Sequence, residues 1–200
     1  MRYKVKNILF VSTLYDALIS ENEDRLFERF MGEIYQYSLF SLPRITGVTS
    51  GTQAMEVLKT KHFDLVIIMV GLDKKKPVEI SRNIRQKYRK LPIYMMVNQK
   101  TDVKHFEELI PTTSSIDKLF VWDGNSQVLF AIVKSIEDAA NVENDTAIGL
   151  VRVILLIEDN TIYYSRYLQY LYSIVFGQVQ QLLSEDERNE INKIQKMRSR

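Results

Sequence analysis

Apolar residues in this chain fall into short β-branched runs, separated by longer segments in which they recur at every third or fourth position. The central run is residues 63–71, FDLVIIMVG, which is too short for an ordinary helix and closes with a glycine. Continuous runs of this kind are typical of parallel strands with helices on both faces. We therefore predict a buried central strand. Chemistry in open α/β sheets gathers at the carboxyl ends of strands, which here means Met69 and Val70.

The same alternation continues along the chain. Ser20 and Glu23 form a capping box at the start of a first helix, which Pro43 stops. Pro77 fits the first position of another helix. Four further strands are predicted at residues 7–12, 44–48, 93–97 and 118–122, with helices opening near residues 20, 50, 77, 102 and 125.

Five strands that alternate with helices imply parallel pairing through right-handed crossovers. The predicted fold class is therefore α/β, a doubly wound five-stranded parallel sheet. The flavodoxin-like order 2-1-3-4-5 is the commonest at this size, although the pattern does not prove the order.

Residues 6–140 resemble the receiver domains of two-component response regulators. The stretches that carry the likeness are TSGTQAMEVLK, FDLVIIM, IRQKYRKLPIYMMV and SIDKLFVW. The resemblance implies a phosphorylated aspartate at the end of the third strand, an acidic pair for magnesium after the first, a hydroxyl after the fourth and a lysine after the fifth.

The functional groups that a receiver site requires are absent at the matching positions, which are Ser12, Thr13, Met69, Val97 and Trp122. Magnesium needs hard oxygen ligands, and phosphate needs a carboxylate acceptor. The sequence therefore predicts a degenerate receiver, or pseudo-receiver, that has no catalytic residues and no cofactor in its first domain and acts only through its surfaces.

One alternative concerns the alignment with receiver domains, which could slip by a residue. Asp73 follows the central strand closely and could substitute as phosphoacceptor. In the simpler interpretation it is a solvated loop acid beside three lysines at residues 74–76.

The pattern restarts after a polar segment, residues 141–146, which is a linker or a helix end. We expect a pseudo-receiver at residues 1–140, a linker at 141–149, and the first strand and long helices of an incomplete second receiver-like domain at 150–200. Residues 151–157, VRVILLI, predict a buried strand, and Glu158 and Asp159 follow it. By resemblance these acids could bind Mg; alternatively, they are acids favoured at a helix start.

The last segment is predicted to be helical over residues 161–183, capped by Asn160 or Thr161, and a second capping box at Ser184 and Glu187 predicts a separate final helix. A single strand cannot bury both its faces. We therefore expect the chain to continue, and the isolated arm to form a homodimer or to dock on the first domain. The predicted interface residues are Tyr163, Tyr167, Leu171, Ile174 and Val175.

Composition narrows the function classes. The chain has 200 residues, 46% hydrophobic and 26% charged, with a net charge of +2 and no cysteine. Disulfides and cysteine chemistry are excluded. Nucleic acid and membranes are not expected as partners, because the net charge is small and no apolar run is long enough to span a bilayer. We expect a cytoplasmic protein, because no signal-peptide pattern follows Met1.

At the scale of the whole chain, stretches such as SLFSLPRITGVTS and GLVRVILLIED are similar to the amino-terminal region of large bacterial proteins with tandem receiver-like domains ahead of a phosphoenolpyruvate synthase or pyruvate phosphate dikinase type domain. That resemblance implies an ATP-dependent phosphotransferase as parent, with none of its catalytic residues in these 200. The leading hypothesis is a non-catalytic interaction module. The alternatives are a phosphorylation-dependent response regulator and a flavodoxin-like ligand-binding protein or enzyme, which the missing phosphate-binding loop disfavours.

Overall fold

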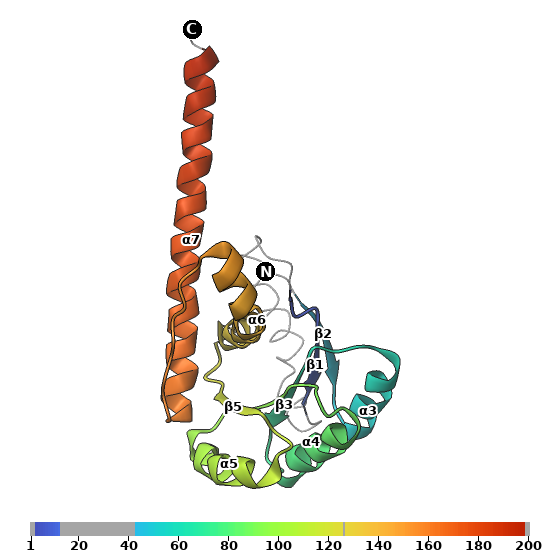
Figure 1. Ribbon diagram of the computed structural model, residues 1–200. Helices are drawn as coiled ribbons and strands as arrows, with labels where there is room; N and C mark the ends of the chain where they lie inside the picture. The colour runs from blue at the N-terminus through green and yellow to red at the C-terminus, as the bar shows by residue number, and fades with distance from the viewer. Residues whose placement is uncertain (1–2, 13–42, 126, 199–200) are drawn as a thin grey trace.

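Five parallel strands form one sheet in the order β2-β1-β3-β4-β5. The computed structural model describes residues 3–12, 43–125 and 127–198. The predicted α/β architecture and strand order are therefore confirmed (Figure 1). The strands are β1 (Asn7–Val11), β2 (Arg44–Val48), β3 (Leu65–Val70), β4 (Ile93–Val97) and β5 (Lys118–Val121).

The central strand β3 is buried at all six positions. Its alternate side chains enter different layers of the core. Leu65, Ile67 and Met69 pack on the side of α6 (Gln127–Gly149), whereas Val66 and Ile68 pack against α3 (Gly51–Thr60) and α4 (Lys75–Lys87). This two-faced burial explains why the strand reads as an unbroken apolar run.

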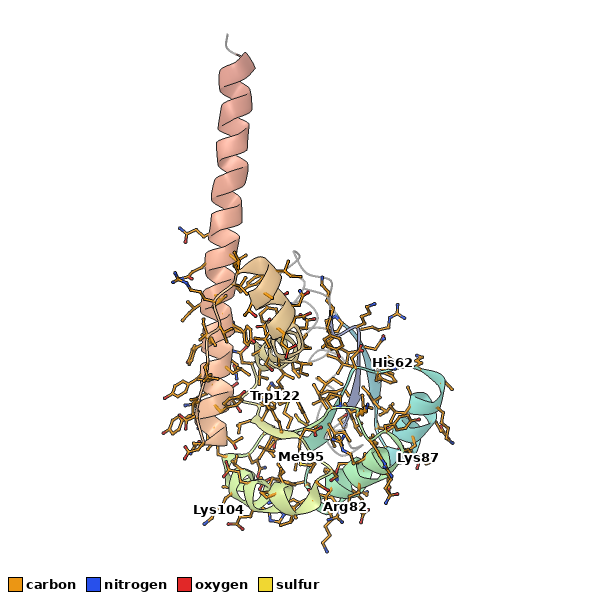
Figure 2. All side chains as sticks on the ribbon, viewed as in Figure 1. His62, Arg82, Lys87, Met95, Lys104 and Trp122 are labelled. Carbon is orange, nitrogen blue, oxygen red and sulfur yellow. The ribbon has the colours of Figure 1, made fainter. Side chains whose placement is uncertain are left out.

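Helices α3, α4 and α5 (Lys100–Thr113) cover one face of the sheet (Figure 1). Helix α3 opens at the predicted place, where Ser50 caps it: the Ser50 hydroxyl accepts a hydrogen bond from the Gln53 amide at 3.2 Å. Basic side chains such as Arg82, Lys87 and Lys104 lie on the outer sides of α4 and α5 (Figure 2). Helix α4 begins two residues before Pro77, which therefore occupies its third position instead of the predicted first.

Helix α6 covers the other face, and α7 (Thr161–Arg198) lies against α6 and the β5 edge of the sheet (Figure 1). The Ser165 hydroxyl of α7 accepts a hydrogen bond from the Val121 amide at 3.0 Å. Leu168 joins the core cluster under α6, and Phe176 packs edge-on against Phe130 with ring centroids 5.5 Å apart. The edge of β5, which would otherwise be open, is thus covered by a helix.

The strand predicted at residues 151–157 is not formed. The segment has no regular secondary structure, and most of its apolar side chains are exposed, with Leu155 at 78% and Ile157 at 83%. A strand requires a neighbouring strand to satisfy its backbone, and no strand in the described part of the chain pairs with this segment.

Residues 141–149, expected to be a linker or a helix end, form the last part of α6. Asn141 is buried there, and its side-chain amide donates to the Tyr3 and Glu137 carbonyls. Helix α7 also continues through Ser184, where a new helix was predicted. No proline interrupts the helix, so the Ser184 motif has no free helix end to cap.

The helix predicted to begin at Ser20 and end before Pro43 lies outside the described residues, as does Thr13.

Candidate functional site

The carboxyl ends of β1, β3, β4 and β5 lie side by side, because parallel strands end at the same side of a sheet. Ser12 follows β1, is 9% exposed, and donates its amide to the Val48 carbonyl at 3.0 Å. Met69 and Val97 are buried near the ends of β3 and β4. The structure therefore brings Ser12, Met69 and Val97 to the same end of the sheet.

Trp122 completes this row at the end of β5 (Figure 2). Its amide donates to the Val97 carbonyl at 2.8 Å, and its half-buried ring packs against the core cluster that contains Met69. The four described positions thus present a hydroxyl, a thioether, an alkyl group and an indole. None of them is a carboxylate that could accept phosphate or bind a hard cation.

A buried acid on this side of the sheet, Asp102, belongs to an ion pair between helices. Asp102 lies in the first turn of α5, is only 5% exposed, and pairs with the Lys74 ammonium just before α4. A buried carboxylate with a paired ammonium is already satisfied. This contact holds the starts of two helices together, and sequence reasoning missed it because residues 74 and 102 lie far apart in the chain.

Asp73 is exposed in the loop between β3 and α4. One carboxylate oxygen accepts from the Lys75 amide at 3.0 Å and from the Lys76 amide at 3.3 Å. These backbone hydrogen bonds lower the pKa of the Asp73 carboxyl below its ordinary value. Asp73 therefore behaves as a capping residue at the start of α4.

Glu158 and Asp159 lie just before α7, where Glu158 is half-buried and Asp159 is exposed. The Glu158 carboxylate accepts from the Asn160 amide at 3.0 Å. Asn160 caps α7 as predicted, because its side-chain oxygen accepts from the amides of Ile162 and Tyr163. Among the described residues, no three His, Asp or Glu side chains gather as a metal site would require, so the Mg site stays a prediction.

The predicted interface residues of α7 divide by burial. Tyr163, Tyr167, Ile174 and Val175 are exposed, whereas Leu171 is half-buried. The rings of Tyr163 and Tyr167 stack with centroids 6.0 Å apart. The structure does not test whether these side chains form an interface.

Sequence reasoning missed Tyr170, which is 64% exposed. With it, the exposed residues 163, 167, 170 and 174 follow alternating spacings of four and three, which place them along one side of a helix. That spacing was readable in the sequence. What the sequence did not reveal is which side of α7 packs on the sheet.

The fold of this chain is similar to the flavodoxin-like fold of receiver domains. Among the described residues, no helix is both long and apolar enough to cross a membrane. No protein-family model and no curated protein matches the chain.

Solved structures give the particular likenesses. The signal receiver domain of an HD domain-containing protein from Pseudomonas fluorescens Pf-5 superimposes with a TM-score of 0.50 at 16% identity, covering 70% of this chain and 99% of that one. An uncharacterized protein from Neptuniibacter caesariensis gives 0.52 at 15% identity, over 77% and 100%. An adenylate cyclase structure from Rhodopirellula baltica gives 0.51 at 14% identity, over 72% and 97%. At these identities the likeness concerns the fold.

Proposed function

We propose that this chain is a non-catalytic regulatory module that binds other proteins, a pseudo-receiver that keeps the receiver fold without its phosphoacceptor. The observation that carries the proposal is the row of side chains at the carboxyl end of the sheet, Ser12, Met69, Val97 and Trp122. Three of these side chains are largely apolar and packed into the core, so they support the fold and offer no group for phosphate or magnesium.

The direct test is phosphoryl uptake. The chain is incubated with a small phosphodonor such as acetyl phosphate and with Mg²⁺, and its intact mass is measured. We expect no gain of a phosphoryl group, because Met69 occupies the acceptor position. A matched receiver domain with an intact aspartate serves as the positive control for the donor.

A gain of one phosphoryl group would overturn the proposal and favour the response-regulator alternative. Asp73 would then be the first candidate, since it is an exposed carboxylate directly after β3. Loss of the label in Asp73→Ala, with the label retained in Asp123→Ala, would assign it. Asp123 is the matched control because it is also an exposed loop carboxylate that accepts a nearby backbone amide.

We further propose that the module stands at the amino terminus of a larger cytoplasmic protein of the phosphoenolpyruvate synthase type, an ATP-dependent phosphotransferase whose downstream domains are partners of this module. The support is the resemblance of stretches such as GLVRVILLIED. The mass and peptide map of the native protein test it: a longer chain with a nucleotide-binding region is expected. A native chain of 200 residues would refute this part and leave the module itself unaffected.

A further inference from the structure

Residues 151–157 form an extended apolar segment whose backbone lacks partners. The Val151 amide donates to the Asp145 carbonyl at 3.5 Å. From residue 152 to residue 157, no backbone amide or carbonyl makes a hydrogen bond within the described part of the chain. Unpaired groups of this kind are the template on which another strand pairs. Among protein partners, a β-strand is the one that satisfies a whole row of such amides and carbonyls.

The side chains of this segment are apolar on both faces. Leu156 is half-buried and packs against the core cluster under α6 and α7. Val153, Leu155 and Ile157 have the opposite parity and are exposed at 60%, 78% and 83%. Three aliphatic side chains so exposed in one row indicate a surface that another chain covers.

The charged residues at the two ends of the segment favour a second copy of this chain as the partner. Arg152 and Glu158 stand at opposite ends of the apolar run, three residues on either side of Leu155. If two copies pair antiparallel about Leu155, each Arg152 lies opposite Glu158 of the other copy, and every apolar residue between them lies opposite an apolar residue. Directly opposed charges of opposite sign stabilise a strand pair, whereas parallel pairing in register would oppose like charges.

We propose that residues 151–159 pair antiparallel with the same segment of a second copy of this chain, with Leu155 on the two-fold axis. Such an interface is self-complementary, as a symmetric dimer requires. The proposal does not depend on the lost phosphoacceptor, and it places the dimer contact on the extended segment in preference to the tyrosines of α7.

Cysteine cross-linking tests the register, because the chain contains no cysteine of its own. In Leu155→Cys the two sulfur atoms face each other across the axis, where directly opposed Cβ atoms lie about 5 Å apart. In Ile157→Cys the two cysteines are offset by four residues, about 13 Å along the strands. Ile157 is the matched control, because it is at least as exposed as Leu155.

We expect Leu155→Cys to form a covalent dimer under mild oxidation and Ile157→Cys to do so at least about tenfold more slowly, since a disulfide needs Cβ atoms about 4 Å apart. The readout is a non-reducing gel. Equal rates for the two variants, or no cross-linking in either, would overturn the proposed register.

A charge exchange provides the second test. Sedimentation equilibrium at tens of micromolar should show a dimer of the unmodified chain. Arg152→Glu and Glu158→Arg should each weaken dimerisation by about tenfold, because each places like charges opposite each other at two sites. The double variant should restore it. Since Arg152 is exposed and Glu158 is half-buried at the surface, circular dichroism is expected to report the same fold for all the variants.

Three outcomes would contradict the proposal: an unmodified chain that stays monomeric at these concentrations, a double variant that remains as weak as the single ones, or a dimer lost in Tyr167→Ser and unaffected by the charge changes. The first outcome would assign the segment to a strand of another protein or domain. The last would assign the contact to the exposed tyrosines of α7.

Discussion

Asp138 of α6 accepts a hydrogen bond from the Tyr172 hydroxyl of α7 at 2.8 Å. Partial burial, together with the neighbouring Glu137 and Asp145, raises the pKa of the Asp138 carboxyl, although this hydrogen bond and Lys134 act in the opposite direction. Burial and the neighbouring carboxylate also raise the pKa of Tyr172. At the residue scale, the contact between the two helices thus joins a carboxyl at the exposed surface of α6 to a half-buried hydroxyl of α7, and partial burial raises the pKa of both groups.

The pH dependence of Asp138→Asn tests this contact. The pKa of Asp138 is raised in the folded state, so its protonated form stabilises the fold. This stabilisation is fully present below the unfolded-state pKa, and it is lost as the pH rises through the folded-state pKa. The amide of the variant does not titrate but can still accept from Tyr172. We therefore expect the stability of the variant, relative to the unmodified chain, to increase as the pH rises from acid values to neutrality, measured by urea unfolding at each pH.

Asp73→Asn is the matched control, because the pKa of Asp73 is lowered and its relative stability should change in the opposite direction. The same trend in both variants would contradict the assignment.

At the element scale, β5 depends on α7. Ser165 of α7 donates to the Thr161 carbonyl in its own helix and accepts from the buried Val121 amide at the sheet edge. An extended strand edge with a buried, unbonded amide would be costly. Helix α7 therefore completes the sheet as well as covering it.

Ser165→Ala should destabilise the fold by about 1–3 kcal/mol, because the Val121 amide loses its acceptor in a place that water reaches poorly. The measurement is chemical denaturation. Ser173→Ala is the control: it makes the same change in helix propensity in α7, but its hydroxyl bonds only the Gln127 side chain. Equal losses in the two variants would show that the Val121 contact contributes little.

Local sequence signals predicted the elements well where the chain supplies its own partners. The buried run of β3 and the Ser50 and Asn160 caps are satisfied by neighbouring backbone or by the sheet. The strand predicted at residues 151–157 is not formed, because a strand needs a neighbouring strand for its backbone hydrogen bonds and no strand in the described part of the chain pairs with it. The prediction that a new helix starts at Ser184 was wrong, because a capping motif does not act in the middle of an unbroken helix.

At the scale of the whole molecule, the strand order was predictable from the rhythm of strands and helices, and the chemistry at the carboxyl end from four residue identities. Docking of the arm on the first domain was one of the two outcomes expected from the sequence, but the side of α7 that packs was not predictable. Its aromatic residues surround much of the helix, so periodicity did not identify the packed side that Ser165, Leu168 and Phe176 occupy.

Truncation separates the two parts of α7. The described side chains that pack on the domain end near Phe176, and beyond them the helix projects from the domain (Figure 1). A chain that ends after Gln181 should therefore keep the thermal midpoint of the full chain. One that ends after Gly149 should melt earlier or aggregate, because it uncovers β5 and the core cluster that Leu168 joins. A large loss of stability in the longer truncation would contradict this division.

A continuous helix that is anchored at one end acts as a lever. From Ser165 to Arg198, α7 spans about 50 Å at 1.5 Å per residue. A tilt of about 10° where it meets β5 would displace its far end by about 9 Å, more than the spacing of adjacent strands. Small changes at the sheet edge would thus become large movements of whatever is joined to the end of the helix.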